Sequence, residues 1–193
     1  MSKNRIEELY EVAVLQYIPY YTKITLDAGQ VNRAKKKIKT IIEKKQKEYS
    51  HQVDYKKQSI RWLTGLCGEM AVEQYLGIPF VDLSAGDSKD YNYPDLNKLG
   101  INIGIKTSKL GNFPVIQKHN TQSQIILIKI DDLSFYLCGI ANPISLNEYQ
   151  SDELILDQNI IKLGKKTCFY GFNQLFNISR LKDIYYEAQN RNG

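Results

Sequence analysis

The hydrophobic spacing of the chain changes at Gly77 and Pro79, and this change constrains the fold more than any other sequence feature. Before these residues, apolar side chains recur every three or four positions, which is typical of amphipathic helices. After them, short apolar runs are separated by polar loops, which is typical of strands. Helices, then strands, then a last helix beginning near Ser179 predict an α/β (α+β) fold, with a mixed sheet flanked by helices.

The predicted elements divide the chain into two parts. Helices are expected over residues 3–17, from a cap at Asp27 to about Tyr49, and over residues 55–75. Strands are expected at residues 80–83, from Asp95, and at 101–107, 113–117, 124–130 and 135–140. We expect Gly100 to join the Asp95 strand to residues 101–107 as a hairpin. Residues 1–54 are thus predicted to be a helical N-terminal extension, and residues 55–193 an α/β domain.

Positive charge is concentrated in residues 33–48, RAKKKIKTIIEKKQKE, which hold eight basic and two acidic side chains. The whole chain has a net charge of +5, so the remainder is close to neutral. Because Ile38, Ile41 and Ile42 recur at helical spacing, one face of this helix should pack and the other should present lysine. Such a face is either simply solvated or binds phosphates, which requires charge and reach but no sequence readout.

The three cysteines, Cys67, Cys138 and Cys168, are widely spaced and suit a reducing compartment better than a disulfide framework. Without CxxC spacing and with only two histidines, a zinc site is not expected. Any bound metal should therefore be a hard cation held by oxygen. The longest apolar runs are far shorter than the roughly 20 residues that span a bilayer, so no membrane association is expected.

Three side chains together offer the groups that phosphodiester cleavage requires. Glu69 lies in an expected helix, Asp95 follows a proline, and Lys106 interrupts the apolar strand INIGIKTS. Carboxylates can hold Mg²⁺ at the scissile phosphate, where a lysine can orient or deprotonate the attacking water. Each residue also has a simpler interpretation: Glu69 as a solvated helix residue, Asp95 as a turn former, and Lys106 as a charge on a strand edge.

The order of these segments resembles the PD-(D/E)xK nuclease superfamily over roughly residues 60–140. Pro94-Asp95 matches the PD pair, and Gly104-Ile105-Lys106 occupies the (D/E)xK position. Glu69 lies where many members, including Holliday junction resolvases and restriction enzymes, carry a metal-binding glutamate. The resemblance implies a restriction endonuclease-like sheet and a catalytic set of Glu69, Asp95 and Lys106. It also implies Mg²⁺, for which Mn²⁺ can substitute, held at Glu69, Asp95 and Ile105.

Gly104 departs from the family pattern, because the family has an acid at this position. By the resemblance, one metal-binding carboxylate is missing. Either Glu69 supplies it, with Glu73 one turn later on the same helix face, or an acid from Asp87 or Asp90 reaches the site. The remaining alternative is that the protein is inactive.

Two features beyond Lys106 also bear on the resemblance. A strand is predicted after this lysine where the family usually has a helix. Gln117 resembles the glutamine that some members carry beyond the lysine, and it is a candidate accessory residue together with Glu73 and Asp90.

Three functions are compatible with these observations. The first is a Mg²⁺-dependent DNA endonuclease of restriction, phage-encoded or junction-cleaving type. The second is an inactive nucleic-acid-binding protein on a nuclease scaffold, and the third is an interaction protein whose basic helix binds an acidic partner. If the first function is correct, we expect the protein in the cytoplasm of a bacterial or phage-infected cell. We also expect a homodimer, since two related active sites cut both strands of a duplex most simply. The predicted DNA contacts are Lys35, Lys36, Lys37, Lys39, Lys44 and Lys45.

Overall fold

The structure is a computed structural model that describes residues 3–48, 55–81, 94–162 and 164–192. Its helices are α1 (Lys3–Ala13), α2 (Ala28–Glu48), α3 (Tyr55–Leu76), α4 (Pro143–Glu148), α5 (Gln158–Lys162) and α6 (Arg180–Asn192). Its strands are β1 (Thr22–Thr25), β2 (Ile103–Lys109), β3 (Val115–Gln117), β4 (Ser123–Lys129), β5 (Ser134–Ala141), β6 (Gln150–Ser151) and β7 (Lys166–Phe169). Short 3-10 turns cover Leu15–Tyr20, Asn97–Leu99, Asp152–Leu154 and Phe172–Gln174.

The main sheet has four strands in the order β1-β5-β4-β2. β2 runs parallel to β4, while the β4–β5 and β5–β1 pairs are antiparallel. The sheet is therefore mixed and is flanked by helices, as the sequence predicts. β2 occupies one edge of this sheet, a position that leaves half of its backbone groups free to bind other parts of the chain.

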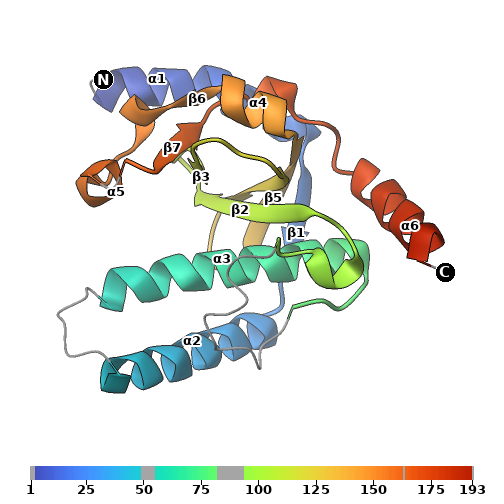
Figure 1. Cartoon of the computed structure of the whole chain (residues 1–193). Helices are drawn as coiled ribbons and strands as arrows, with labels where there is room; N and C mark the ends of the chain where they lie inside the picture. Colours follow the sequence, from blue (N-terminus) through green and yellow to red (C-terminus); the bar gives the residue numbers. More distant parts are fainter. Residues whose placement is uncertain (1–2, 49–54, 82–93, 163, 193) are drawn as a thin grey trace.

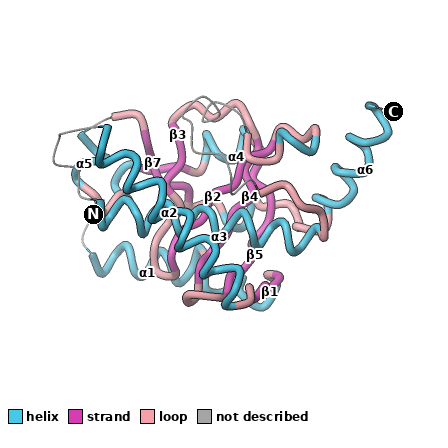
Figure 2. The backbone as a smooth tube through the Cα atoms, turned by 90° about the horizontal axis from the view of Figure 1, so that it is seen from below, coloured by secondary structure: helices cyan, strands magenta, loops and turns pink. Residues whose placement is uncertain are grey.

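Helices α3 and α2 form successive layers on one face of the main sheet (Figures 1 and 2). α3 packs directly against the strands, and α2 packs against α3 on its far side (Figure 1). The opposite face is covered by α1, α4 and a second, small sheet with the strand order β3-β7-β6. β4 is therefore buried on both faces, which explains its continuous apolar run, SQIILIK.

Two hydrophobic cores lie on the two faces of the main sheet. Ile125 and Leu127 of β4 belong to the core beneath α3, together with Met70 of that helix. Ile126 and Ile128 point the other way, into the core formed with α1 and the small sheet. This alternation assigns every second residue of a strand to one face, so the odd-numbered residues of β2 face α3.

The basic helix begins as the sequence predicts. The Asp27 carboxylate accepts the amide of Gln30 at 2.8 Å, and the Gln30 side chain accepts the amide of Asp27 at 2.9 Å. This reciprocal pair is a capping box, which satisfies two amides at the start of a helix. Val31, Ala34 and Ile38 are buried and hold α2 against α3, which leaves the remaining faces of α2 toward solvent.

The predicted hairpin between Asp95 and residues 101–107 is wrong. The chain after Pro94 forms a turn and then the 3-10 turn Asn97–Leu99, and Gly100 ends this turn with a φ of 73°. β2 begins at Ile103 and pairs with β4 on its other side. The Asp95 side chain, rather than a strand backbone, binds the free edge of β2, so the two segments remain neighbours without forming a hairpin.

Other elements also differ from the sequence predictions. The first helix ends at Ala13, and a 3-10 turn that includes Pro19 follows it. β1 lies within the segment assigned to a helical extension and pairs with β5 of the main sheet. Residues 80 and 81 form no strand, whereas the rest of that predicted strand and the boundary at residue 54 lie outside the described residues.

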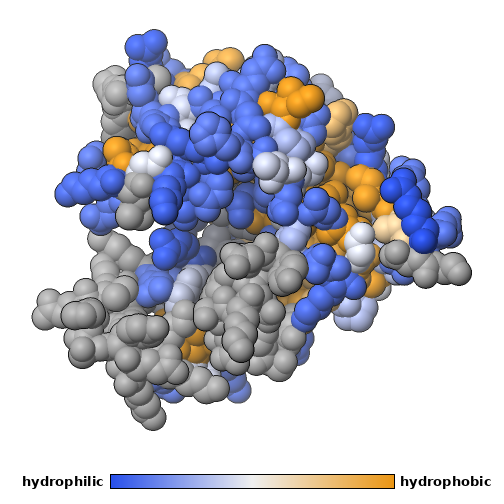
Figure 3. All heavy atoms as spheres, in the orientation of Figure 1, coloured by the Kyte–Doolittle hydropathy of each residue, from blue (hydrophilic) through white to orange (hydrophobic). Residues whose placement is uncertain are grey.

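The surface shown in Figure 3 is mainly hydrophilic, with hydrophobic side chains exposed where α6 leaves the rest of the molecule. A groove of about 380 Å³ lies there and includes Ile103, Ile140, Phe176 and Ile184 in its lining. In the described part of the chain, no helix is long and apolar enough to cross a membrane.

Candidate active site

The candidate site lies at the free edge of β2, where backbone groups of the strand bind the segment that carries Asp95. The amide of Ile105 donates a hydrogen bond to the Asp95 carboxylate at 2.5 Å, and the amide of Leu96 donates to the Ile103 carbonyl at 3.2 Å. Within a strand, the N–H and C=O of one residue point to the same side. The carbonyl oxygen of Ile105 therefore faces the same edge as the Asp95 carboxylate.

Asp95 is exposed as a residue, but its carboxylate turns inward onto the Ile105 amide. Burial of this carboxylate raises its pKa above the ordinary aspartate value. The hydrogen bond from Ile105 and the positive charge of Lys106 act in the opposite direction and favour the ionised form. Asp95 is thus held in place by the backbone of the strand that carries the lysine.

Gly68 allows α3, which carries Glu69, to approach β2 closely. A Cβ atom at Gly68 would lie 1.9 Å from Oγ1 of Thr107, so no larger residue fits this helix–strand contact without displacement. The next residue, Glu69, is partly buried. A small residue before the glutamate is therefore a packing requirement at this point of the sequence.

The ionisation of Glu69 is coupled to both other candidate residues. The pKa of Glu69 is raised to about 7, first by burial and then by the negative charge of Asp95, while the positive charge of Lys106 opposes the rise. Such coupling requires the three groups to lie in one electrostatic neighbourhood. The structure thus brings Glu69, Asp95 and Lys106 together, while their chemical roles remain a prediction.

Lys106 also belongs to a group of positive charges that sequence reasoning missed. The pKa of Lys166 is lowered, first by burial and then by the charges of Arg61 and Lys106. Arg61 precedes Glu69 on α3, whereas Lys166 begins β7 of the small sheet. Arg61 could have been suspected from its place on the same helix as Glu69. Lys166 could not, because neither β7 nor its pairing with β3 was predicted.

Among the described residues, no contact joins Glu73 or Gln117 to Glu69, Asp95 or Lys106. Both backbone amides at Phe80 and Val81 donate to the Glu73 carboxylate at 2.7 Å, so this side chain holds the segment after α3. Gln117 is exposed at the end of β3 and pairs across the small sheet with Lys166. The other acids considered, Asp87 and Asp90, lie outside the described residues.

The oxygen groups at the edge of β2 fit a hard divalent cation. Glu69 and Asp95 offer carboxylates and Ile105 offers a carbonyl, which are the ligand types that Mg²⁺ and Mn²⁺ accept. Across the described ranges, no three His, Cys, Asp or Glu side chains are grouped closely enough to hold a metal ion by themselves. A cation at this edge would therefore need further oxygen ligands besides the carboxylates of Glu69 and Asp95.

The basic helix α2 presents its lysines on a different part of the surface. Lys35, Lys36 and Lys39 are exposed and Lys37 is partly buried, whereas the side chains of Lys44 and Lys45 are not among those described. α3 lies between α2 and the sheet (Figure 1). The lysines of α2 are thus separated from the edge of β2 by a helix.

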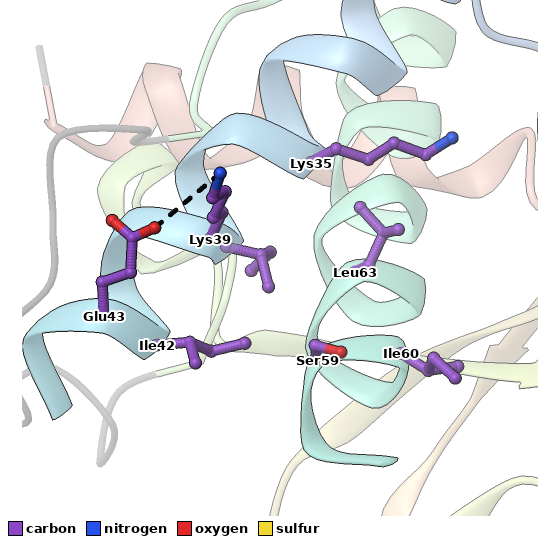
Figure 4. Close-up of a pocket in the computed structure, with 8 residues that line it drawn as sticks. Lys35, Lys39, Ile42, Glu43, Ser59, Ile60 and Leu63 are labelled. Carbon is purple, nitrogen blue, oxygen red and sulfur yellow. Dashed lines mark ion pairs between the residues drawn. The ribbon is translucent and has the colours of Figure 1, made fainter. Parts of the chain in front are cut away.

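A groove of about 520 Å³ lies between α2 and α3 (Figure 4). Ile38, Ile42, Ile60 and Leu63 make most of its lining apolar. Lys39 lies at this groove and forms an ion pair with Glu43 at 3.9 Å. None of the three candidate catalytic residues lines this groove, so it is a feature apart from the site.

Comparisons with other proteins give no relative for this chain: no family model, no curated protein and no solved structure matches it.

Proposed function

We propose that the protein is a Mg²⁺-dependent endonuclease that hydrolyses DNA phosphodiester bonds at the free edge of β2. The observation that carries this proposal is the coupling of Glu69, Asp95 and Lys106 beside an edge-facing backbone carbonyl. Two buried carboxylates with raised pKa values, one of them raised partly by the charge of the other, with a lysine next to them, are a functional arrangement more often than a structural one.

Glu69, Asp95 and the carbonyl of Ile105 would hold the Mg²⁺ ion, and Mn²⁺ would be able to replace it. When bound, the ion supplies charge stabilisation at the scissile phosphate and lowers the pKa of the attacking water. The protein fixes one ligand in advance, because the Ile105 amide orients the Asp95 carboxylate. Glu69 is the adjustable partner, because its pKa of about 7 allows it to be protonated or ionised near neutral pH.

Lys106 acts on the phosphate and the water. Its ammonium group donates hydrogen bonds to the attacking water and offsets the negative charge that develops on the phosphoryl oxygens. Arg61 and Lys166 extend the positive field around Lys106 and would hold the neighbouring phosphates of the strand. The exposed lysines of α2 would add contacts to the DNA backbone that do not depend on sequence.

The finer features of the proposal follow from the same site. The helix carrying Glu69 and the edge strand carrying Lys106 support a restriction endonuclease-like arrangement of the mixed sheet. Cleavage of both strands of a duplex would be simplest in a homodimer with two related sites. We place this activity in the cytoplasm of a bacterial or phage-infected cell, where its DNA substrate would be found.

A second function is favoured by Gly104. This residue leaves no acid at the position where the resembling family has one, and the described residues offer only Glu69 and Asp95 as charged ligands. On this account the protein binds nucleic acid on a nuclease scaffold and does not cleave it.

Cleavage of a supercoiled plasmid and of labelled oligonucleotides tests the two functions against each other. With Mg²⁺ or Mn²⁺, the endonuclease should produce nicked and linear products, and EDTA should stop the reaction. Asp95→Asn is the matched control, because it keeps the size of the side chain and removes the charge that would hold the cation. Binding without cleavage by the wild type under every metal condition would favour the second function.

A further inference from the structure

Gly104 and Gln124 occupy facing positions on the two parallel strands β2 and β4. A Cβ atom at Gly104 would lie 2.4 Å from Oε1 of Gln124 and 3.0 Å from its Nε2. The Gln124 amide thus fills the space that any side chain at Gly104 would need. The backbone of Gly104 does not lie in the left-handed region, so packing rather than conformation explains the glycine.

Within the described part of the chain, the amide oxygen of Gln124 accepts no hydrogen bond. The residue is only 7% exposed, and its Oε1 atom is buried without a hydrogen bond among the described residues. An unsatisfied buried acceptor destabilises a folded protein. Thr107 Oγ1 of β2 is also buried without a partner among the described residues, but it lies on the face toward α3. A bound ion is one explanation for a buried oxygen without a partner.

The Gln124 oxygen, which belongs to β4, lies beside Gly104 of β2. Side chains alternate along β2, so Gly104 and Lys106 share one face of the strand. The residue between them is Ile105, whose amide binds Asp95. The Gln124 amide therefore lies where the side chain of an acid at position 104 would begin.

We propose that Gln124 supplies, through Oε1, the oxygen ligand that Gly104 leaves out of the divalent-cation site, an inference that rests on the proposed nuclease function. Glutamine carbonyls are accepted by hard divalent cations. A neutral ligand makes the site less negative than one with three carboxylates. This arrangement accounts at once for the missing acid, for the absence of a side chain at position 104, and for the unpaired amide oxygen.

Metal binding by the full chain without DNA provides the test, with Mn²⁺ titrations by calorimetry and the Mn²⁺-induced rise in melting temperature as readouts. Gln124→Leu should weaken Mn²⁺ binding by about tenfold or more, a typical loss when a metal site is perturbed. Gln124→Glu should bind Mn²⁺ more tightly than the wild type, because a charged ligand replaces a neutral one. Gln150→Leu is the matched control, since Gln150 also has a buried, unpaired Oε1 but belongs to the small sheet.

A reciprocal exchange tests the positional argument. Gly104→Glu alone should lower the melting temperature, because the new Cβ overlaps the Gln124 amide. Combined with Gln124→Gly, the same change should recover the melting temperature and bind Mn²⁺ at least as tightly as the wild type. This double variant also addresses the case in which Gln124→Leu fails to fold.

The results separate the two proposals. Unchanged Mn²⁺ affinity in Gln124→Leu, together with a loss in Asp95→Asn, would overturn the role of Gln124 and leave the proposed nuclease site standing. Absence of Mn²⁺ binding by the wild type would overturn both. Equal weakening in Gln124→Leu and Gln150→Leu would attribute the effect to packing and would also reject the ligand role.

Discussion

Replacing Glu69 by glutamine should make the protein more stable at alkaline pH. The pKa of Glu69 rises from an ordinary 4.5 to about 7 in the folded protein. Each pKa unit corresponds to about 1.36 kcal/mol, so ionised Glu69 destabilises the fold by about 3 kcal/mol. Glutamine has nearly the same size and carries no charge. The free energy of unfolding at pH 8 should therefore rise by up to about 3 kcal/mol in Glu69→Gln.

The sign of the pH dependence follows from proton binding. Between pH 4.5 and 7 the folded protein holds the Glu69 proton and the unfolded chain has lost it, so stability falls as the pH rises. The contribution is fully present below pH 4.5 and is lost once the pH passes 7. Urea unfolding followed by circular dichroism at pH 5, 6, 7 and 8 measures the difference between wild type and Glu69→Gln. A difference that stays constant across this range would refute the assigned environment of Glu69.

Three further perturbations test other parts of the account. In α3, Gly68→Ala should destabilise the fold by about 1–3 kcal/mol because the new Cβ overlaps Thr107. Gly65→Ala meets no atom within 4 Å and should stabilise α3 by roughly 0.5–1 kcal/mol, and thermal unfolding of both variants checks the contrast. DNA binding, measured by fluorescence anisotropy, should be weaker in Arg61→Gln and in Lys166→Gln. Unchanged affinity would show that these two side chains do not contact the DNA. Four lysines of α2 can be replaced together by glutamine: Lys35, Lys36, Lys37 and Lys39. The slope of log affinity against log salt concentration should then become shallower by up to about 0.9 per lost phosphate contact. An unchanged slope would exclude contact between these lysines and the DNA backbone.

The sequence predicts most elements whose pattern is local. The cap at Asp27 and the extent of α3 depend on neighbouring residues, and the structure contains both. The small sheet depends on pairing between distant segments, such as Val115 with Cys168. Short strands of this kind carry little periodic signal, so their pairing could not be predicted from the sequence.

The residues of the candidate site could be predicted from the sequence, but the contacts between distant segments could not. The sequence places Glu69, Asp95 and Lys106 on neighbouring segments, and the structure brings them together. However, Asp95 is held beside β2 by a side-chain hydrogen bond to the Ile105 amide, and not by the expected hairpin. The partner of Gly104 could not be predicted, since the facing residue, Gln124, is fixed by parallel pairing across the sheet.

The central claim is tested most directly by Lys106→Ala in single-turnover cleavage of a labelled DNA duplex with Mg²⁺, with DNA affinity measured in parallel. Lys106 is proposed to act mainly on the transition state, so its loss should fall on rate rather than on binding. We expect a cleavage rate lowered by roughly 10²–10³-fold, the typical effect of removing one charge-stabilising group, with DNA affinity changed only a few-fold. Cleavage by Lys106→Ala at the wild-type rate would contradict the assignment of this edge of β2 as the active site.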